Sequence, residues 1–127
     1  MKALVLNNGN LSQQEIRNEL EELQRIVGGY IEIPFLSEVF NDNEIDIVIN
    51  EEGKLIDGMN PEIAIVNEED GRILDIVYGN CIFVSHDDEG NTVGLNDKQI
   101  AVVVEELKTK AILRNATKTF EVRALFI

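Results

Sequence analysis

The sequence predicts an α+β fold, in which a mainly antiparallel sheet of five to six strands packs with two amphipathic helices. Two segments, near residues 16–27 and 100–107, carry apolar residues at helical spacing. Between and around them lie short apolar runs that end at turns rich in glycine and asparagine. With 127 residues, 44% of them hydrophobic, the chain can bury one core. We expect residues 1–127 to form a single domain, with residues 109–127 as a basic C-terminal strand extension.

The segment from Leu20 to Leu36 is expected to join the first helix to a strand. A stripe of apolar residues lies at spacings of four, three and four: Ile16, Leu20, Leu23 and Val27. Gly28 follows the stripe, where a left-handed residue can end a helix at no steric cost to glycine. The residues from Tyr30 to Phe35 then have the β-branched and aromatic character of a short strand.

The first helix is expected to begin soon after a first strand at residues 2–7 and a turn at residues 8–10. Ser12 is placed as the N-cap, and Glu15 follows three residues later as its capping-box partner. After the segment described above, residues 37–44 are polar and are expected to be irregular. Residues 45–49 alternate and predict a strand that ends at Asn50.

Three acidic turns ending near glycine predict an antiparallel meander in the middle of the chain. They lie at residues 51–54, 69–72 and 87–90, with apolar runs at residues 55–56, 63–66, 73–78 and 81–84 between them. Gly79 and Asn80 interrupt the longest apolar stretch. Two interpretations of this pair remain open: it forms either a tight turn or a β-bulge.

The second helix is expected to begin at Asn96, with Gln99 completing a capping box, and to extend to about Arg114. Residues 120–126 alternate and predict a last strand. The expected element order is β-α-β-β-β-β-α-β.

The net charge of −13 argues against direct nucleic-acid binding, which requires a basic surface. The charge is unevenly distributed, because residues 1–106 hold 6 Lys/Arg and 23 Asp/Glu whereas residues 107–127 hold five Lys/Arg and only Glu121. No apolar run approaches the roughly 20 residues of a membrane helix, and no signal peptide is recognisable. We therefore expect a cytoplasmic protein without membrane contact.

Four sequence motifs resemble an uncharacterised domain-of-unknown-function family of small bacterial proteins. They are LQRIVGGYIE at 23–32, NEEGKL at 50–55, D-x-x-x-G-N-C-I-F-V at 75–84 and LNDKQI at 95–100, and the resemblance covers roughly residues 1–108. The family is common in phages, prophages and conjugative elements of Gram-positive bacteria. It usually has a leucine-proline turn followed by asparagine-arginine after the second motif, where this chain has residues 58–62 as GMNPE. The resemblance implies a mobile-element context and transfers no catalytic residue.

Residues with catalytic or metal-binding potential are few. Ser85, His86 and Asp87 are adjacent on a predicted strand, so their side chains point to alternate faces and cannot form a triad among themselves. Cys81 lies in an apolar run without a basic neighbour, which favours a buried, inert thiol. The acidic residues from Asp42 to Asp46 lack the glycine and final glutamate of a calcium loop. We predict no catalytic residue, no metal ligand and no cofactor.

Polar residues within the motifs and the loops beside them are the candidates for binding a ligand or partner: Tyr30, Glu32, Asn50, Lys54, Asn60, Asp75 and Asn80. Asp75 stands inside an apolar run, so it is either a structural partner of Tyr30 or a group that faces a ligand. The leading hypothesis is a non-catalytic phage or mobile-element accessory protein that binds a host protein or small signalling molecule and counteracts host defence. Two alternatives are an acidic nucleic-acid mimic that inhibits a host DNA-binding protein, and an unrecognised metal-dependent enzyme. The charge asymmetry and the apolar residues 124–127 also predict a homo-oligomer, formed by pairing of the terminal strand across a sheet edge.

Overall fold

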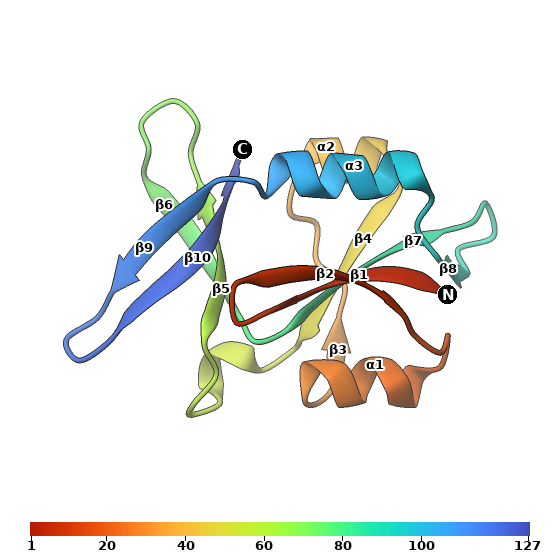
Figure 1. Cartoon of the computed structure of the whole chain (residues 1–127), viewed down its shortest axis with the longest axis horizontal. Helices are drawn as coiled ribbons and strands as arrows, with labels where there is room; N and C mark the ends of the chain where they lie inside the picture. Colours follow the sequence, from red (N-terminus) through yellow and green to blue (C-terminus); the bar gives the residue numbers. More distant parts are fainter.

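The computed structural model describes residues 1–127 and contains ten β-strands, three α-helices and one 3-10 helix (Figure 1). The elements in chain order are β1 (Lys2–Asn7), β2 (Asn10–Glu15), α1 (Leu20–Val27), β3 (Ile31–Glu32), α2 (Glu38–Asp42), β4 (Ile45–Asn50), η1 (Gly53–Leu55), β5 (Pro61–Val66), β6 (Ile73–Tyr78), β7 (Cys81–His86), β8 (Thr92–Val93), α3 (Asp97–Glu106), β9 (Lys110–Arg114) and β10 (Thr119–Phe126). None of the three α-helices has the length and apolar character needed to cross a membrane.

The strands form two sheets rather than the single sheet that was expected. The large sheet has the order β2-β1-β7-β4-β3, with β8 paired to β7, and the small sheet has the order β6-β5-β10-β9. Every strand pair is antiparallel except β10 and β5, which are parallel. The predicted α+β class with mainly antiparallel pairing is thus confirmed, whereas the strand number and the two-helix count are wrong.

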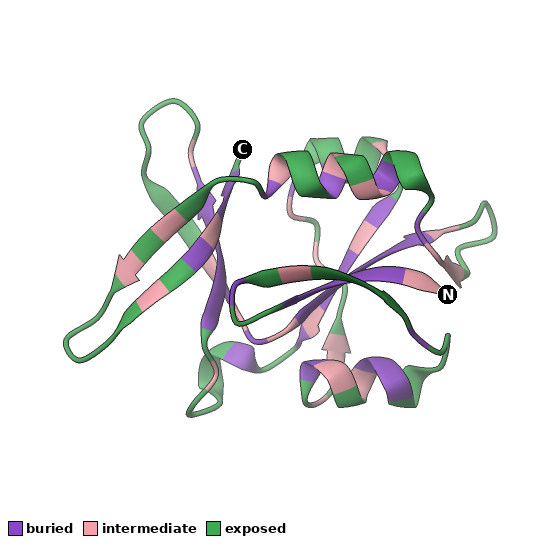
Figure 2. Ribbon diagram, viewed as in Figure 1, coloured by how far each residue is buried: buried purple, intermediate pink, exposed green.

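Helices cover both faces of the large sheet (Figure 1). Leu23 and Val27 of α1 pack on one face with Val5, Val48 and Ile82. The opposite face forms the largest core cluster, in which α2, α3 and the inner face of the small sheet pack against it: Leu4, Leu6, Phe40, Ile45, Ile47, Ile63, Ile65, Val77, Cys81, Phe83, Leu95, Val103, Leu107 and Leu125. The buried residues concentrate along these central strands (Figure 2).

The predicted start of the first helix at Ser12 is wrong, because residues 10–15 form strand β2. Asn8 and Gly9 both have positive φ, at 52° and 82°, which suits the tight turn of a two-residue hairpin. This turn directs residues 10–15 back along β1. The two strands pair in antiparallel register, with Asn10 opposite Asn7 at the turn and Glu15 opposite Lys2 at the far end. Backbone pairing with a core strand outweighs the local capping pattern, and α1 begins only at Leu20.

The end of α1 follows the prediction. Gly28 has φ +84° and its N–H donates to the carbonyl of Gln24, as a left-handed C-cap does. The strand expected from Tyr30 to Phe35 is reduced to the two residues of β3, and residues 33–37 form an extended link to α2. The short helix α2 replaces the irregular segment expected there, because the side chain of Ser37 accepts the N–H of Phe40 as an N-cap.

The predicted capping box of the second helix is confirmed. Asn96 accepts the N–H of Gln99, and the Gln99 side chain accepts the N–H of Asn96. The predicted extent of this helix is wrong, since α3 ends at Glu106 and residues 110–114 form β9. Residues 109–127 therefore contribute a β-hairpin, and β10 lies inside the small sheet between β5 and β9.

The expected meander is divided between the two sheets. Strands β5 and β6 form a hairpin in the small sheet, whereas β7 belongs to the large sheet. Gly79 has φ +85° and joins β6 to β7 through the two-residue link Gly79-Asn80, so the pair forms a turn between sheets rather than a bulge. The run at residues 55–56 is exposed and is not a strand.

Candidate functional site

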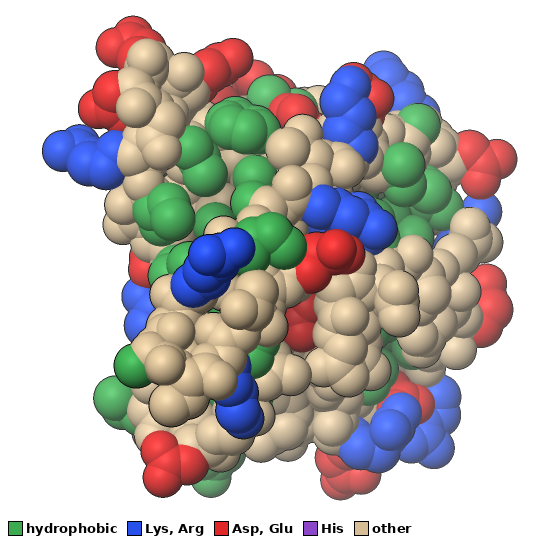
Figure 3. Space-filling view, turned by 60° about the vertical axis from the view of Figure 1, so that its left-hand side comes forward, with side chains coloured by type: hydrophobic (Ala, Val, Ile, Leu, Met, Phe, Trp, Pro, Cys, Tyr) green, Lys and Arg blue, Asp and Glu red, His purple; other side chains and the backbone are tan.

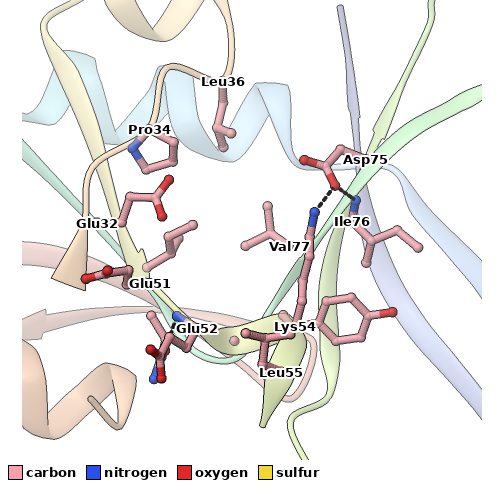
Figure 4. Close-up of a pocket in the computed structure, with 14 residues that line it drawn as sticks. Glu32, Pro34, Leu36, Glu51, Glu52, Lys54, Leu55, Asp75, Ile76 and Val77 are labelled. Carbon is pink, nitrogen blue, oxygen red and sulfur yellow. Dashed lines mark hydrogen bonds and ion pairs between the residues drawn. The ribbon is translucent and has the colours of Figure 1, made fainter. Parts of the chain in front are cut away.

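A cleft opens where the edge of the large sheet meets the small sheet, and we call it the inter-sheet cleft (Figure 4). Its volume is about 350 Å³, within the range of sites that hold small molecules or single side chains of a partner. It is bounded by β3 and the link after it, the end of β4, η1 and β6. The lining residues are Glu32, Pro34, Leu36, Ile49, Asn50, Glu51, Glu52, Gly53, Lys54, Leu55, Asp75, Ile76, Val77 and Tyr78.

The inter-sheet cleft combines an apolar lining with carboxylates. Glu32, Glu51 and Glu52 are exposed, and their side chains form no hydrogen bond or ion pair within the chain. Figure 4 shows the Glu32 carboxylate directed into the cleft, with Pro34 and Leu36 above it and Val77 across from it. A cationic group entering the cleft would therefore meet the free Glu32 carboxylate beside an apolar surface, with the charges of Glu51 and Glu52 on the same wall.

The only lysine of the cleft is already paired. Lys54 Nζ donates to Asp75 Oδ1, which also accepts the N–H of Ile76 at 2.8 Å. The Lys54 ammonium holds the pKa of Asp75 below its usual range. Of the two roles predicted for Asp75, partnership with Tyr30 is wrong, because Asp75 pairs with Lys54 at the cleft wall (Figure 4).

The NEEGKL motif builds one wall of the cleft. Asn50 accepts the N–H of Glu52 at 2.8 Å and so stabilises the turn into η1. A Cβ on Gly53 would lie 2.7 Å from the carbonyl oxygen of Tyr78, so only glycine lets η1 approach β6 this closely. This approach carries Lys54 to Asp75 and leaves Leu55 82% exposed at the rim.

Two of the predicted binding residues hold the end of α1. Asn50 is buried, and its amide donates to the carbonyl of Val27 at 3.1 Å. The amide of Asn80 donates to the carbonyl of Ile26, also at 3.1 Å. Carbonyls in the last turn of a helix have no partner within the helix, so these asparagines satisfy groups that would otherwise be left without one.

The seven predicted candidates thus divide between several places. Four of them, Glu32, Asn50, Lys54 and Asp75, line the inter-sheet cleft. Asn60 and Asn80 line a separate polar hollow beside Gly28. Tyr30 lies outside both and is 73% exposed.

Sequence reasoning missed part of the cleft and one buried carboxylate. Glu51 and Glu52 lie within the NEEGKL motif, from which Asn50 and Lys54 were chosen as binding candidates. Their negative charge could have marked them as candidates too. Glu62 is 1% exposed and accepts the N–H groups of Asn8 and Gly9, each at 2.9 Å. No local pattern marks Glu62, because its partners lie more than 50 residues away.

The remaining reactive residues lie elsewhere. Cys81 is fully buried, as predicted, and burial raises the pKa of its thiol. His86 Nδ1 lies 3.0 Å from Asp46 Oδ2, whereas Ser85 donates to the carbonyl of Glu44. The structure contains no group of three or more His, Cys, Asp or Glu side chains placed to hold a metal ion.

Comparison with known proteins identifies the family. The family model described as a domain of unknown function, DUF3846, matches residues 1–108. The chain belongs to the DUF3846 family. No curated protein and no solved structure matches the chain. The DUF3846 match contains all the residues that line the inter-sheet cleft, whereas the β9–β10 hairpin lies beyond the matched residues.

Proposed function

We propose that this DUF3846 protein is a non-catalytic binding protein whose site is the inter-sheet cleft. One observation carries the proposal: the Glu32 carboxylate, which has no partner in the chain, is directed into a preformed hollow with an apolar lining, and the unpaired Glu51 and Glu52 lie on the same wall (Figure 4). Leu55 adds an apolar side chain that is 82% exposed at the rim, where it can contact a bound molecule.

The charge of the cleft indicates the chemistry of the ligand. Four carboxylates and one ammonium line the cleft, and the ammonium is paired with Asp75. An anionic ligand such as a nucleotide signal would be repelled, whereas an amine or guanidinium with an attached apolar group would be attracted. Between a host protein and a small signalling molecule, we therefore favour a host protein that presents an arginine or lysine next to an apolar residue.

The biological setting is part of the proposal. The sequence motifs resemble proteins of phages, prophages and conjugative elements of Gram-positive bacteria. In this setting the protein would act in the bacterial cytoplasm as an accessory factor against host defence, by occupying a basic segment of a host protein.

The test is capture of partners from a bacterial host lysate, with mass spectrometry for proteins and small molecules. The wild-type protein and the variant Glu32→Lys serve as baits, since the reversed charge lies at the cleft. Exposed ion pairs contribute about 0.2–1 kcal/mol each, and a reversal adds repulsion, so we expect at least a fivefold loss of the captured partner.

The matched control is Glu89→Lys, which makes the same charge change in the exposed turn after β7, away from the cleft. This variant should retain the partner. The proposal would be wrong if both variants retained the partner equally, or if the recovered ligand were an anion.

A second candidate is a nucleic-acid mimic that inhibits a host DNA-binding protein. The net charge of −13 and the exposure of the acidic residues at 51–52, 68–70 and 87–89 favour it. A mimic binds through negative charge spread over its whole surface, so Glu32→Lys and Glu89→Lys should weaken capture of the partner equally. Moderate salt should abolish this capture, because it screens the charges. The same experiment therefore separates the two functions.

A further inference from the structure

The outer face of the small sheet is apolar, and the side chains that cover its centre come from the small sheet itself. Its buried centre consists of Ala64, Val66, Val122 and Ala124, and the residues packed around them come from the same sheet: Ala111, Leu113 and Phe120. Pairing register places Ile73 and Ile76 of β6 on this face as well, opposite Val66 and Ala64. The three helices lie on the large sheet instead (Figure 1).

The two ends of the small sheet carry opposite charges. The β5–β6 turn presents Glu68, Glu69, Asp70 and one basic residue, Arg72, for a net charge of −2, and the β9–β10 hairpin presents Arg114 and Lys118. None of these six side chains forms an ion pair within the chain. Figure 3 shows hydrophobic side chains gathered on this side of the molecule, with mostly acidic side chains above them and mostly basic side chains below.

The strand directions place these charged turns at opposite ends of the face. Strand β10 runs parallel to β5, so its last residues lie beside the β5–β6 turn and its first residues lie at the hairpin tip. The eight residues of β10 span roughly 26 Å at about 3.3 Å per residue. A two-fold axis that lies in the plane of the interface, at right angles to the line joining the two turns, would place the acidic turn of each copy on the basic hairpin of the other.

We propose that the outer face of the small sheet binds a second copy of this chain, and that two small sheets stack into a β-sandwich across a two-fold axis. The exposed and half-buried apolar residues around the buried centre, such as Ile73, Leu113 and Phe120, supply the contact, and the charged ends set the antiparallel orientation of the two sheets. This arrangement replaces the pairing of the terminal strand across a sheet edge, because β10 has β5 on one side and β9 on the other.

The size of the face sets the expected strength. Four strands about 4.8 Å apart, each contributing about five residues, outline roughly 19 Å by 17 Å. This face is small beside the about 800 Å² per partner of a standard interface, so the dimer should be weak, with a dissociation constant in the micromolar range. Sedimentation velocity between about 10 and 500 μM should therefore show a concentration-dependent monomer–dimer equilibrium.

Two matched variants test the face. Ile73→Glu places a charge on the outer face, where Ile73 is 47% exposed, and should raise the dissociation constant at least tenfold. Ile112→Glu makes the same change at a residue that is 58% exposed and that register places on the opposite face of the sheet, and it should leave the constant within about twofold. Circular dichroism checks that both variants are folded.

A charge exchange tests the orientation. Lys118→Glu and Glu69→Lys should each weaken the dimer about three- to tenfold, and the double variant should recover most of the loss, because each reversed charge meets the other across the two-fold axis. A protein that stays monomeric at every concentration would overturn the proposal. The proposal would also be overturned if Ile73→Glu left the dissociation constant unchanged, or if Ile112→Glu raised it as much as Ile73→Glu does. A third contrary result would be a double charge variant that dimerises no more tightly than the more weakly dimerising single variant.

Discussion

Replacement of Asn50 by alanine should destabilise the protein strongly, because this one side chain connects three elements. The residue is 4% exposed, donates to the carbonyl of Val27 at 3.1 Å and accepts the N–H of Glu52 at 2.8 Å. In Asn50→Ala both backbone groups lose their partner. An unsatisfied buried group costs about 1–3 kcal/mol, so we expect a loss of about 3 kcal/mol in the free energy of unfolding.

The measurement is urea unfolding monitored by circular dichroism, with the midpoint and slope fitted together. For a chain of this size 3 kcal/mol corresponds to a decrease of roughly 10 °C in melting temperature. Asn10→Ala is the control, since Asn10 is exposed on β2, and it should stay within about 0.5 kcal/mol of the wild type.

A double-mutant cycle with Gly29 makes the test specific. A Cβ on Gly29 would lie 2.9 Å from Asn50 Nδ2, so Gly29→Ala should be costly in the wild type and nearly neutral once Asn50 is alanine. We expect a coupling energy of about 1 kcal/mol between the two positions. The structural role of Asn50 would be refuted if the two substitutions changed the free energy of unfolding additively, or if Asn50→Ala were as stable as the wild type. Asn50 would then again be a candidate for binding a ligand.

Three further predictions concern the local structure. Asn96→Ala should cost about 1 kcal/mol through loss of the α3 capping box, whereas Ser12→Ala should change stability by less than about 0.5 kcal/mol because Ser12 is exposed on β2; thermal melts of both variants check this. Gly53→Ala should cost about 1–3 kcal/mol in urea unfolding, because its Cβ would meet the backbone of Tyr78, and a neutral result would contradict the close approach of η1. Burial raises the pKa of Glu62, so between the unfolded value of about 4.3 and the raised folded value the native state keeps a proton that the unfolded state has lost. The free energy of unfolding of the wild type, relative to Glu62→Gln, should therefore decline as pH rises through that window, and a difference independent of pH between 4 and 8 would contradict it.

Features that depend on a few neighbouring residues were predictable from the sequence. The Asn96 capping box and the left-handed Gly28 involve partners within one helical turn, so their chemistry is visible in the sequence itself. The alternating residues 45–49 gave a correct strand for the same reason. At residues 12–15 an equally good capping pattern was misleading, since the turn at Asn8-Gly9 brought those residues against β1.

The candidate site was predictable only in part. Glu32, Lys54 and Asp75 could be chosen as polar residues within motifs, yet their convergence on one cleft depends on the packing of two sheets. From the sequence alone, Asn50 and Asn80 could be taken only as binding candidates. Their structural role, donating to carbonyls at the end of α1, was hidden because those carbonyls lie 23 and 54 residues away in the chain.

The sequence by itself determined the α+β class, the antiparallel preference, the positions of some of the tight turns and the acidic character of the chain. The tertiary structure decided the division into two sheets, the strand β9 where a helix was expected, and the burial of Glu62. The physical reason is the range of the interactions. Capping and turn chemistry act within a few residues, whereas strand pairing and side-chain contacts such as Lys54 with Asp75 depend on segments far apart in the chain.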